Sequence, residues 1–250
     1  MSRWRIGCSG YQYAEWRGIF YPESLPQRKW LEHYCEHFDS LELNVTFYRF
    51  PKLEFLQSCY DRSPAHFTFS VKAPRLITHY KRLSDAQGML SDFCEAVHSG
   101  LREKLGCVLF QFPATFIFED DRLEKLITLL KGDCNVVEFR HDSWWQEKVY
   151  RALGDHNITF CSMSHPRLPD EVIRTTPTLY YRFHGVPHLY HSAYDPAKLK
   201  EIIKKIEDTE NVEKAHVYFN NTAEGNAICN AKQLKVLTEG RKSEVQRMRG

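Results

Sequence analysis

The chain has 250 residues, a length that a single α/β barrel domain commonly has. Hydrophobic residues make up 42% of it and charged residues 26%, a composition that argues against a disordered or fibrous protein. The net charge of +2 lacks the strong basic excess of a protein that is held mainly by nucleic-acid phosphates.

The first residues and the cysteines bear on where the protein works. Residues 1–5 run directly into an apparent strand and leave no room for an apolar export segment. No apolar stretch approaches the roughly 20 residues that span a bilayer. The eight cysteines include no C-x-x-C pair, so we interpret them as reduced core thiols. We therefore expect a cytoplasmic protein that does not enter a membrane.

Strand-like segments alternate with amphipathic stretches along the chain. The strands are expected at 5–9, 40–44, 68–73, 107–112, 136–140, 159–164, 179–184 and 216–220. Apolar residues spaced three or four apart predict helices at 30–38, 53–60, 90–105, 123–130, 149–153, 199–206 and 227–237. This alternation indicates parallel βα units, and eight of them favour a closed (β/α)8 barrel of the TIM type.

The segment after the sixth strand breaks the helical pattern. It contains Pro166, Pro169 and Pro177, which are poorly tolerated in a helix beyond its first turn. We expect an irregular crossover there, which replaces most of the sixth helix. Residues 1–237 would then form a single barrel domain, and 238–250 a polar, frayed C-terminal tail.

Alternation along each strand sorts side chains into two faces. The faces rich in Val, Leu and Phe should meet the helices, so the opposite faces point into the barrel. Polar residues concentrate at the carboxyl ends of those inward faces, where active sites of this fold lie. The inward candidates are Ser9, Glu42, Asn44, Lys72, Gln111, Glu138, Arg140, Arg182, His184, Tyr218 and Asn220.

The inward charges predict an anion-binding pocket. Lys72, Arg140 and Arg182 outnumber Glu42 and Glu138 by one. We predict that the three cations clamp an anion and that the two carboxylates, with His184, serve as acid–base groups. The remaining inward polar residues would orient the ligand, and the ring of Tyr11, after the first strand, would stack on it.

Several of these residues have an alternative interpretation. The two carboxylates could be structural members of a buried ion network. Lys72 could form a Schiff base if its pKa were depressed, or act as a charged anchor. His184 could exchange protons or only hold a loop. His33 and His37 have metal-like spacing, but we interpret them as a solvated helix face and predict no metal ligand.

Seven stretches of the chain carry a family resemblance. They are GCSGYQYAEWRGIFYP (7–22), LELNVTFYRFP (41–51), FSVKAPRLITHYKRL (69–83), KLGCVLFQFP (104–113), VEFRHDSWW (137–145), YYRFHG (180–185) and YFNNTAEGNAICNA (218–231). The chain thereby resembles the YecE-like family, a domain of unknown function with a TIM-type barrel. The resemblance implies the barrel and the same strand-end residues, but no reaction. Ser164 stands where this family usually has an acidic residue.

Our leading functional hypothesis is an enzyme that acts by acid–base chemistry on a small anionic compound, phosphorylated or sugar-containing, at the carboxyl-terminal mouth. A carboxylate pair would suit a hydrolase or an isomerase, and we predict no organic cofactor. The alternatives are a nuclease or isomerase that depends on a divalent metal, a nucleic-acid or nucleotide binding module, and a catalytically inactive barrel.

Overall fold

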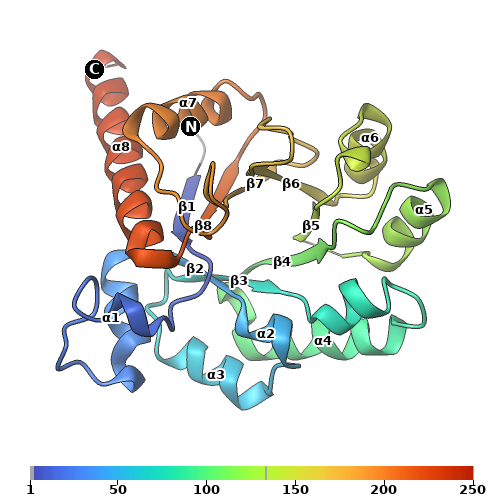
Figure 1. Ribbon diagram of the computed structural model, residues 1–250, viewed down its shortest axis with the longest axis horizontal. Coiled ribbons are helices and arrows are strands. Elements are labelled where there is room, and N and C mark those ends of the chain that lie inside the picture. Colours follow the sequence, from blue (N-terminus) through green and yellow to red (C-terminus); the bar gives the residue numbers. More distant parts are fainter. Residues whose placement is uncertain (1–2, 133, 250) are drawn as a thin grey trace.

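The computed structural model describes residues 3–132 and 134–249, with side chains up to residue 240. Eight parallel strands lie in the order β1-β8-β7-β6-β5-β4-β3-β2, with helices outside them (Figure 1). The strands are β1 (Arg3–Cys8), β2 (Ser40–Leu43), β3 (Thr68–Lys72), β4 (Leu105–Phe112), β5 (Asn135–Phe139), β6 (Thr159–Ser164), β7 (Thr178–Phe183) and β8 (Lys214–Phe219). The predicted (β/α)8 barrel of the TIM type is confirmed, in a nearly closed form.

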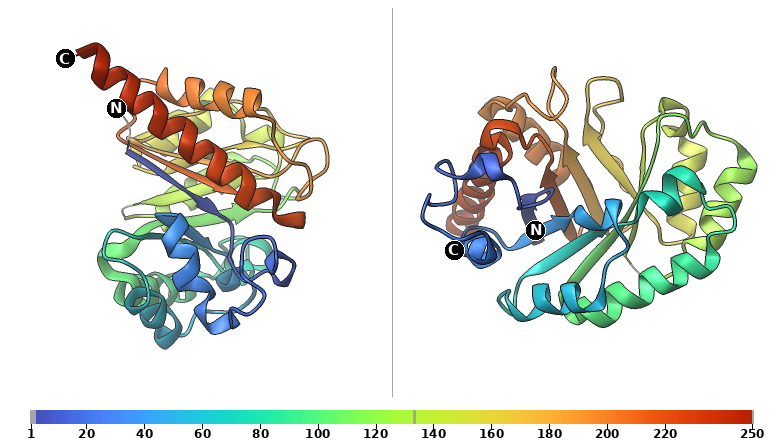
Figure 2. Two further views of the ribbon diagram at one scale, coloured as in Figure 1. Left: turned by 90° about the vertical axis from the view of Figure 1, so that its left-hand side faces the viewer. Right: turned by 60° about the horizontal axis from the view of Figure 1, so that its bottom comes forward.

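Helices connect most successive strands and cover the outer wall of the barrel (Figure 2). The helices are α1 (Trp30–His37), α2 (Val45–Tyr48), α3 (Leu53–Asp61), α4 (Gln87–Leu101), α5 (Asp120–Leu129), α6 (Glu147–Asp155), α7 (Pro196–Glu207) and α8 (Asn226–Arg249). None of the helices described here is both long and apolar enough to cross a membrane. The last helix packs beside the first strand, so α8 covers β1 (Figures 1 and 2).

Local sequence signals explain where α7 begins and how it packs. The side chain of Asp195 accepts a hydrogen bond from Lys198 N at 2.8 Å, and Pro196 occupies the first turn. Both features favour a helix start at this point, because they satisfy or remove backbone donors that the first turn leaves free. The apolar face of α7 is buried and consists of Leu199, Ile202, Ile203 and Ile206.

The barrel has a seam between β1 and β2. These two strands meet through a single backbone bridge between Ser9 and Glu42, whereas ladders of at least two residue pairs join the other neighbouring strands of the described barrel. At the upper end of the seam, Gly10 N donates a hydrogen bond to Glu42 O at 2.8 Å. The backbone therefore closes the cylinder at one level only.

A tyrosine hydroxyl fills the lower part of this seam. The hydroxyl of Tyr34, on α1, accepts a hydrogen bond from Cys8 N at 2.7 Å and donates one to Ser40 O at 3.1 Å. A Cβ atom placed on Gly7 would lie 2.0 Å from Ser40 O, so only glycine permits the two strands to approach this closely. The close approach of the two strands thus depends on the Tyr34 hydroxyl and on the absence of a side chain at Gly7.

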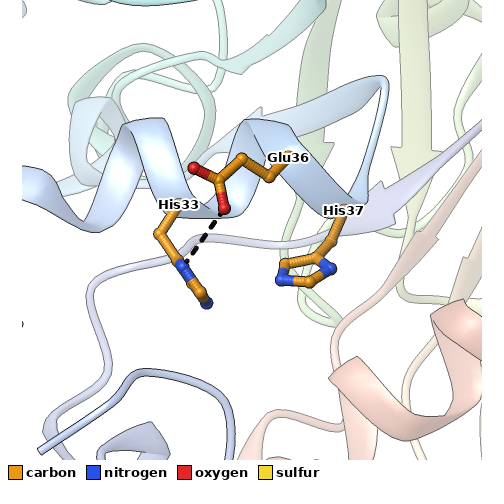
Figure 3. Close-up of side chains that lie close together, drawn as sticks. All are labelled: His33, Glu36 and His37. Carbon is orange, nitrogen blue, oxygen red and sulfur yellow. Dashed lines mark ion pairs between the residues drawn. The ribbon is translucent and has the colours of Figure 1, made fainter.

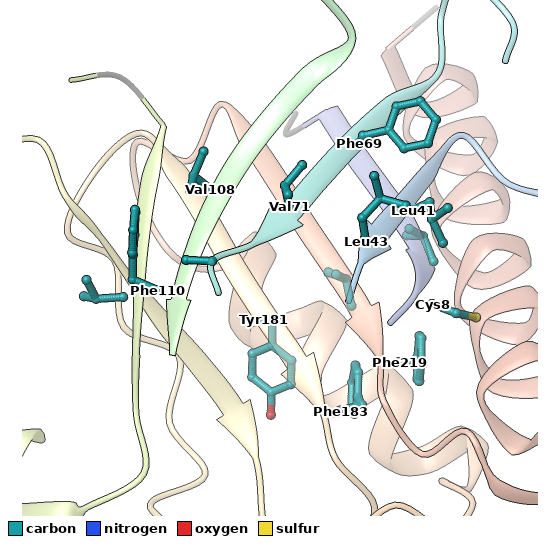
Figure 4. Close-up of a cluster of buried hydrophobic side chains, with 14 of the residues drawn as sticks. Cys8, Leu41, Leu43, Phe69, Val71, Val108, Phe110, Tyr181, Phe183 and Phe219 are labelled. Carbon is teal, nitrogen blue, oxygen red and sulfur yellow. The ribbon is translucent and has the colours of Figure 1, made fainter. Parts of the chain in front are cut away.

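Two separate apolar clusters lie on the two sides of the strands. The larger cluster packs the outer strand faces against the helices, and Figure 4 shows part of it, including Leu41, Leu43, Phe69, Val71, Phe183 and Phe219. These are residues that alternation assigned to the outer face. A small second cluster forms an apolar layer inside the barrel and consists of Cys107, Leu109, Val136, Cys161, Tyr180 and Tyr218.

The crossover between β6 and β7 contains no helix, as the three prolines predicted. Side-chain hydrogen bonds satisfy part of its backbone instead. Ser162 Oγ accepts from Ile173 N at 2.7 Å, and Thr175 Oγ1 donates to Ile158 O at 2.7 Å. The segment is therefore irregular but tied to the strand that it follows.

The C-terminal segment differs from the expected frayed tail. The backbone of α8 continues as a helix to Arg249 instead of ending near Leu237. The polarity of residues 238–249 suggested fraying, but the segment lacks proline and is rich in Glu, Lys, Arg and Gln, which are good helix formers.

Candidate functional site

A buried arginine lies at the centre of the charged layer inside the barrel. Arg182, on β7, donates from Nη2 to Glu42 Oε1 at 2.7 Å and from Nη1 to Glu138 Oε2 at 2.6 Å. Its Nη2 also lies 3.3 Å from Ser9 Oγ. The side chains of Arg182 and both carboxylates are 0% exposed, so strands β2, β5 and β7 share a fully desolvated ion network.

Each carboxylate oxygen in this network has a partner. Tyr180 donates its hydroxyl to Glu42 Oε2 at 2.6 Å, and Arg140 donates from Nε to Glu138 Oε1. Burial would raise the pKa of Glu138, but Arg140 and Arg182 outweigh it and hold that pKa well below its usual range. This geometry favours the ion-network interpretation of Glu42 and Glu138 over the predicted acid–base role.

Arg140 extends from this network toward the solvent. Its side chain is 11% exposed, and its Nη2 lies 3.2 Å from Nε2 of His184. Asn220 Nδ2 lies 3.0 Å from Nδ1 of the same ring. Burial, Arg140 and Arg182 lower the pKa of His184 well below its usual value, so the ring is neutral at pH 7 and can accept hydrogen bonds.

Lys72, the last residue of β3, lacks a carboxylate partner. Lys72 is 9% exposed, and its Nζ atom lies 4.0 Å from the centroid of the Phe47 ring. Among the side chains described, no carboxylate oxygen lies within 4.0 Å of this amine. Burial, and then the charge of Arg182, lowers the pKa of Lys72 to about 7, although Glu138 acts in the opposite direction.

Two further histidines, which strand alternation did not identify, lie at the site. His79 lies in a π-helical turn over Leu76–Tyr80, with Nε2 3.4 Å from Gln111 Nε2 and its ring centroid 5.0 Å from that of Phe47. Burial, Lys72 and Arg140 lower its pKa to about 4. His165 follows β6, and its ring centroid lies 5.8 Å from that of His184. Burial and Arg140 lower the pKa of His165 to about 4.

The signal for both histidines was their position in a segment that follows a strand, His165 directly after β6 and His79 seven residues after β3, because the connections at the carboxyl ends form the mouth of this fold. Alternation says nothing about loop residues. The neighbouring Ser164 ends β6 and is 2% exposed, and its carbonyl accepts from His184 N at 3.0 Å. It therefore helps to fix the position of that ring.

The other predicted ligand contacts lie at different depths. The Tyr218 hydroxyl is buried in the apolar layer within hydrogen-bond distance of Ser40 Oγ and Ser70 Oγ, so its contacts are structural. Tyr11 and Asn44 line a separate hollow of about 240 Å³ at the ends of β1 and β2. The Asn44 Oδ1 atom is buried there without a hydrogen-bond partner. The predicted residues that hydrogen bonds connect are Ser9, Glu42, Glu138, Arg140, Arg182, His184 and Asn220.

A cluster of His33, Glu36 and His37 lies on α1, outside the inward-facing set (Figure 3). One ligand atom from each residue lies within 4.8 Å of the others, and His33 Nδ1 is 3.5 Å from Glu36 Oε2. Burial and the charge of Lys232 lower the pKa of His37, and the same positive charge would oppose a bound cation. The predicted solvated helix face is wrong for the two histidines, because each ring packs against Phe20 with a centroid distance of 5.1 Å and His33 Nε2 lies 3.1 Å from Phe20 O. Of the three residues, Glu36 is the exposed one.

Comparisons with known proteins relate the whole barrel to one family. Residues 5–249 match the family described as "Protein of unknown function DUF72". The UPF0759 protein YecE of Escherichia coli is 30% identical over 145 residues, which are 57% of this chain and about half (51%) of that relative. The UPF0759 protein YunF of Bacillus subtilis is 26% identical over 94% of both chains.

A solved structure extends the likeness to three dimensions. The crystal structure of a DUF72 family protein from Thermotoga maritima superposes with a TM-score of 0.86 and 31% sequence identity. The superposition covers 95% of this chain and 99% of that one, so the two chains share the fold over nearly their whole length. The fold and the sequence match together show that this chain belongs to the DUF72 family.

Proposed function

We propose that the barrel mouth binds a small anionic compound and that the protein is an enzyme acting on it by acid–base chemistry. The observation that carries this proposal is the surplus amine of Lys72. The two buried carboxylates are already engaged by Arg182, Arg140 and Tyr180, so the third cation has no negative partner among the side chains that the structure describes. A desolvated cation gains strongly from an anionic ligand, because little water screens the pair.

The residues around Lys72 divide the work in this proposal. Arg140 and Lys72 contact the anion, and Glu42 and Glu138 hold Arg140 and Arg182 in position. The rings of His184 and His79 are the candidate acid–base groups, and both are in the unprotonated form at neutral pH, because their pKa values lie below 7. Asn220 orients His184 through its Nδ2 atom. A phosphorylated or carboxylated substrate suits this set, and no step requires an organic cofactor.

Thermal denaturation with sulfate or phosphate tests the anion site. At matched ionic strength we expect both anions to raise the melting temperature of the wild type, and Arg140→Met and Lys72→Met to lose most of this gain. Arg151→Met is the matched control, because the Arg151 side chain is 75% exposed and pairs with Glu147 on the surface. Equal stabilisation of all four proteins would refute the site.

The pH dependence gives a second, independent readout. Since the pKa of Lys72 is about 7, the amine carries its charge at about pH 6 and loses it at about pH 8.5. Stabilisation of the wild type by sulfate should therefore shrink over this interval. Stabilisation that is independent of pH from 6 to 8.5 would exclude Lys72 from the anion site.

A further inference from the structure

We propose that Lys72 is a catalytic amine that forms an imine with a small aldehyde or ketone bearing a carboxylate or phosphate. The anionic part of this substrate class rests on the proposed function, because Arg140 would hold it. The carbonyl part rests on the surroundings of the amine itself. The proposal names the bond that the site makes, which anion binding alone does not.

Comparison of two buried lysines shows why Lys72 is the candidate nucleophile. Lys104 Nζ donates to Tyr60 O at 2.5 Å, to Ser63 O at 2.7 Å and to Ser63 Oγ at 3.1 Å. Its three N–H bonds are thus occupied, and it serves as an ammonium anchor. Within the described structure, the Nζ atom of Lys72 has neither a hydrogen bond nor an ion pair, and it lies over the face of the Phe47 ring.

The charges around Lys72 favour its neutral form. Arg182 and Arg140 lie close enough to oppose its protonation, and the two carboxylates nearby are committed to these arginines. Burial acts in the same direction and is the larger cause of a pKa of about 7. A substantial fraction of the amine is therefore unprotonated at neutral pH, which is the form that attacks a carbonyl carbon.

The step balances without an oxidant or a metal. The Nζ lone pair forms the N–C bond while the C=O π electrons move to oxygen, and a proton passes from nitrogen to that oxygen to give a carbinolamine. Loss of the oxygen as water, with a second proton from nitrogen, leaves the C=N bond. We assign the proton transfers to His79, whose ring centroid lies 5.0 Å from that of Phe47, the ring that Lys72 Nζ approaches to 4.0 Å. Its pKa of about 4 leaves the ring unprotonated at pH 7.

Trapping with borohydride tests the imine directly. The purified chain is incubated at about pH 7 with glyoxylate, an anionic aldehyde, then reduced with sodium borohydride and mapped by peptide mass spectrometry. We expect labelling of Lys72 at least about tenfold faster than that of Lys104 or of the surface residue Lys148. The pKa of about 7 leaves much of the Lys72 amine neutral, whereas three acceptors hold the Lys104 amine and Asp120 pairs with Lys148. Labelling of Lys72 no faster than that of Lys104 would overturn the proposal.

Two variants and a second probe separate imine formation from anion binding. Lys72→Arg keeps a cation but removes the nucleophile, so it should retain stabilisation by sulfate and lose the label at position 72. Loss of Arg140 also raises the pKa of Lys72 and so slows trapping of any aldehyde. Glycolaldehyde lacks the carboxylate and measures this common effect, so Arg140→Met should slow trapping of glyoxylate several-fold more than trapping of glycolaldehyde. If both probes label Lys72 equally in the wild type and in Arg140→Met, the imine is supported and the anion clamp is refuted. If sulfate stabilises the wild type but neither probe labels Lys72, the anion site is supported and the imine is refuted.

Discussion

Arg182 and Glu138 form an ion pair with no exposure to solvent, in which Nη1 lies 2.6 Å from Oε2. Breaking such a pair leaves charge in a dry interior, which costs more than the pair itself contributes. We expect Arg182→Met to lower the free energy of unfolding by roughly 3–5 kcal/mol in urea denaturation. Combining it with Glu42→Gln and Glu138→Gln should restore part of that loss. A triple variant less stable than the single one would contradict this account.

Lys72→Met should stabilise the protein below pH 7. The folded-state pKa of about 7 lies below the usual 10.5, so the buried ammonium costs stability fully below about pH 7 and not at all above about 10.5. We expect a gain of roughly 1–3 kcal/mol at about pH 6 that disappears toward pH 10. Urea denaturation across this range measures it. Lys104→Met is the control and should destabilise throughout, because it leaves Tyr60 O and Ser63 O without their donor.

Tyr218→Phe should affect stability and leave the mouth unchanged. The lost hydroxyl is within hydrogen-bond distance of Ser40 and Ser70 in the apolar layer, so we expect a cost of about 1–2 kcal/mol. Stabilisation by sulfate should equal that of the wild type. Tyr180→Phe should cost more, since its hydroxyl donates to the charged Glu42. A Tyr218→Phe variant with altered anion response would restore this tyrosine to the ligand site.

Thiol labelling of the native protein checks the burial of the cysteines. Cys134 and Cys229 are exposed, whereas Cys8, Cys35, Cys59, Cys107 and Cys161 are buried and Cys94 is intermediate. Burial raises the pKa of Cys161 well above its usual value, which further suppresses its thiolate. We expect two thiols to react quickly with a disulfide reagent and the remainder only on unfolding. Fast reaction at Cys161 would mean that the charged layer is open to solvent.

The parts of the fold that sequence patterns predicted depend on local chemistry. Alternating apolar residues assigned Leu41 and Phe219 to the outer face, and the prolines after β6 predicted the missing helix. The length of α8 was underestimated, because polarity measures exposure and not helix propensity. Local signals were therefore sufficient where a single element determined the outcome.

The candidate site was predicted less completely, because its chemistry depends on depth. Alternation assigned both Tyr218 and Arg140 to inward faces. The three-dimensional structure is needed to show that Tyr218 lies in the apolar layer and that Arg140 reaches the mouth. The ion pairs could not be predicted from the sequence either, because Arg182, the partner of Glu42, lies 140 residues away on β7. His79 was missed because it lies in a π-helical turn, outside the strands whose side chains alternation can assign to faces.

The seam between β1 and β2 gives Glu42 a mechanical importance beyond its charge. Its backbone forms the single bridge to Ser9, and its side chain is held by Arg182, which also reaches Ser9 Oγ from across the barrel. The guanidinium of Arg182 therefore links β1 and β2, which no continuous ladder joins. Loosening this link would widen the cylinder where Lys72 and Arg140 approach the opening. The contacts of Arg182 with Glu42 and Ser9 consequently set both the width of the mouth and its electrostatic balance.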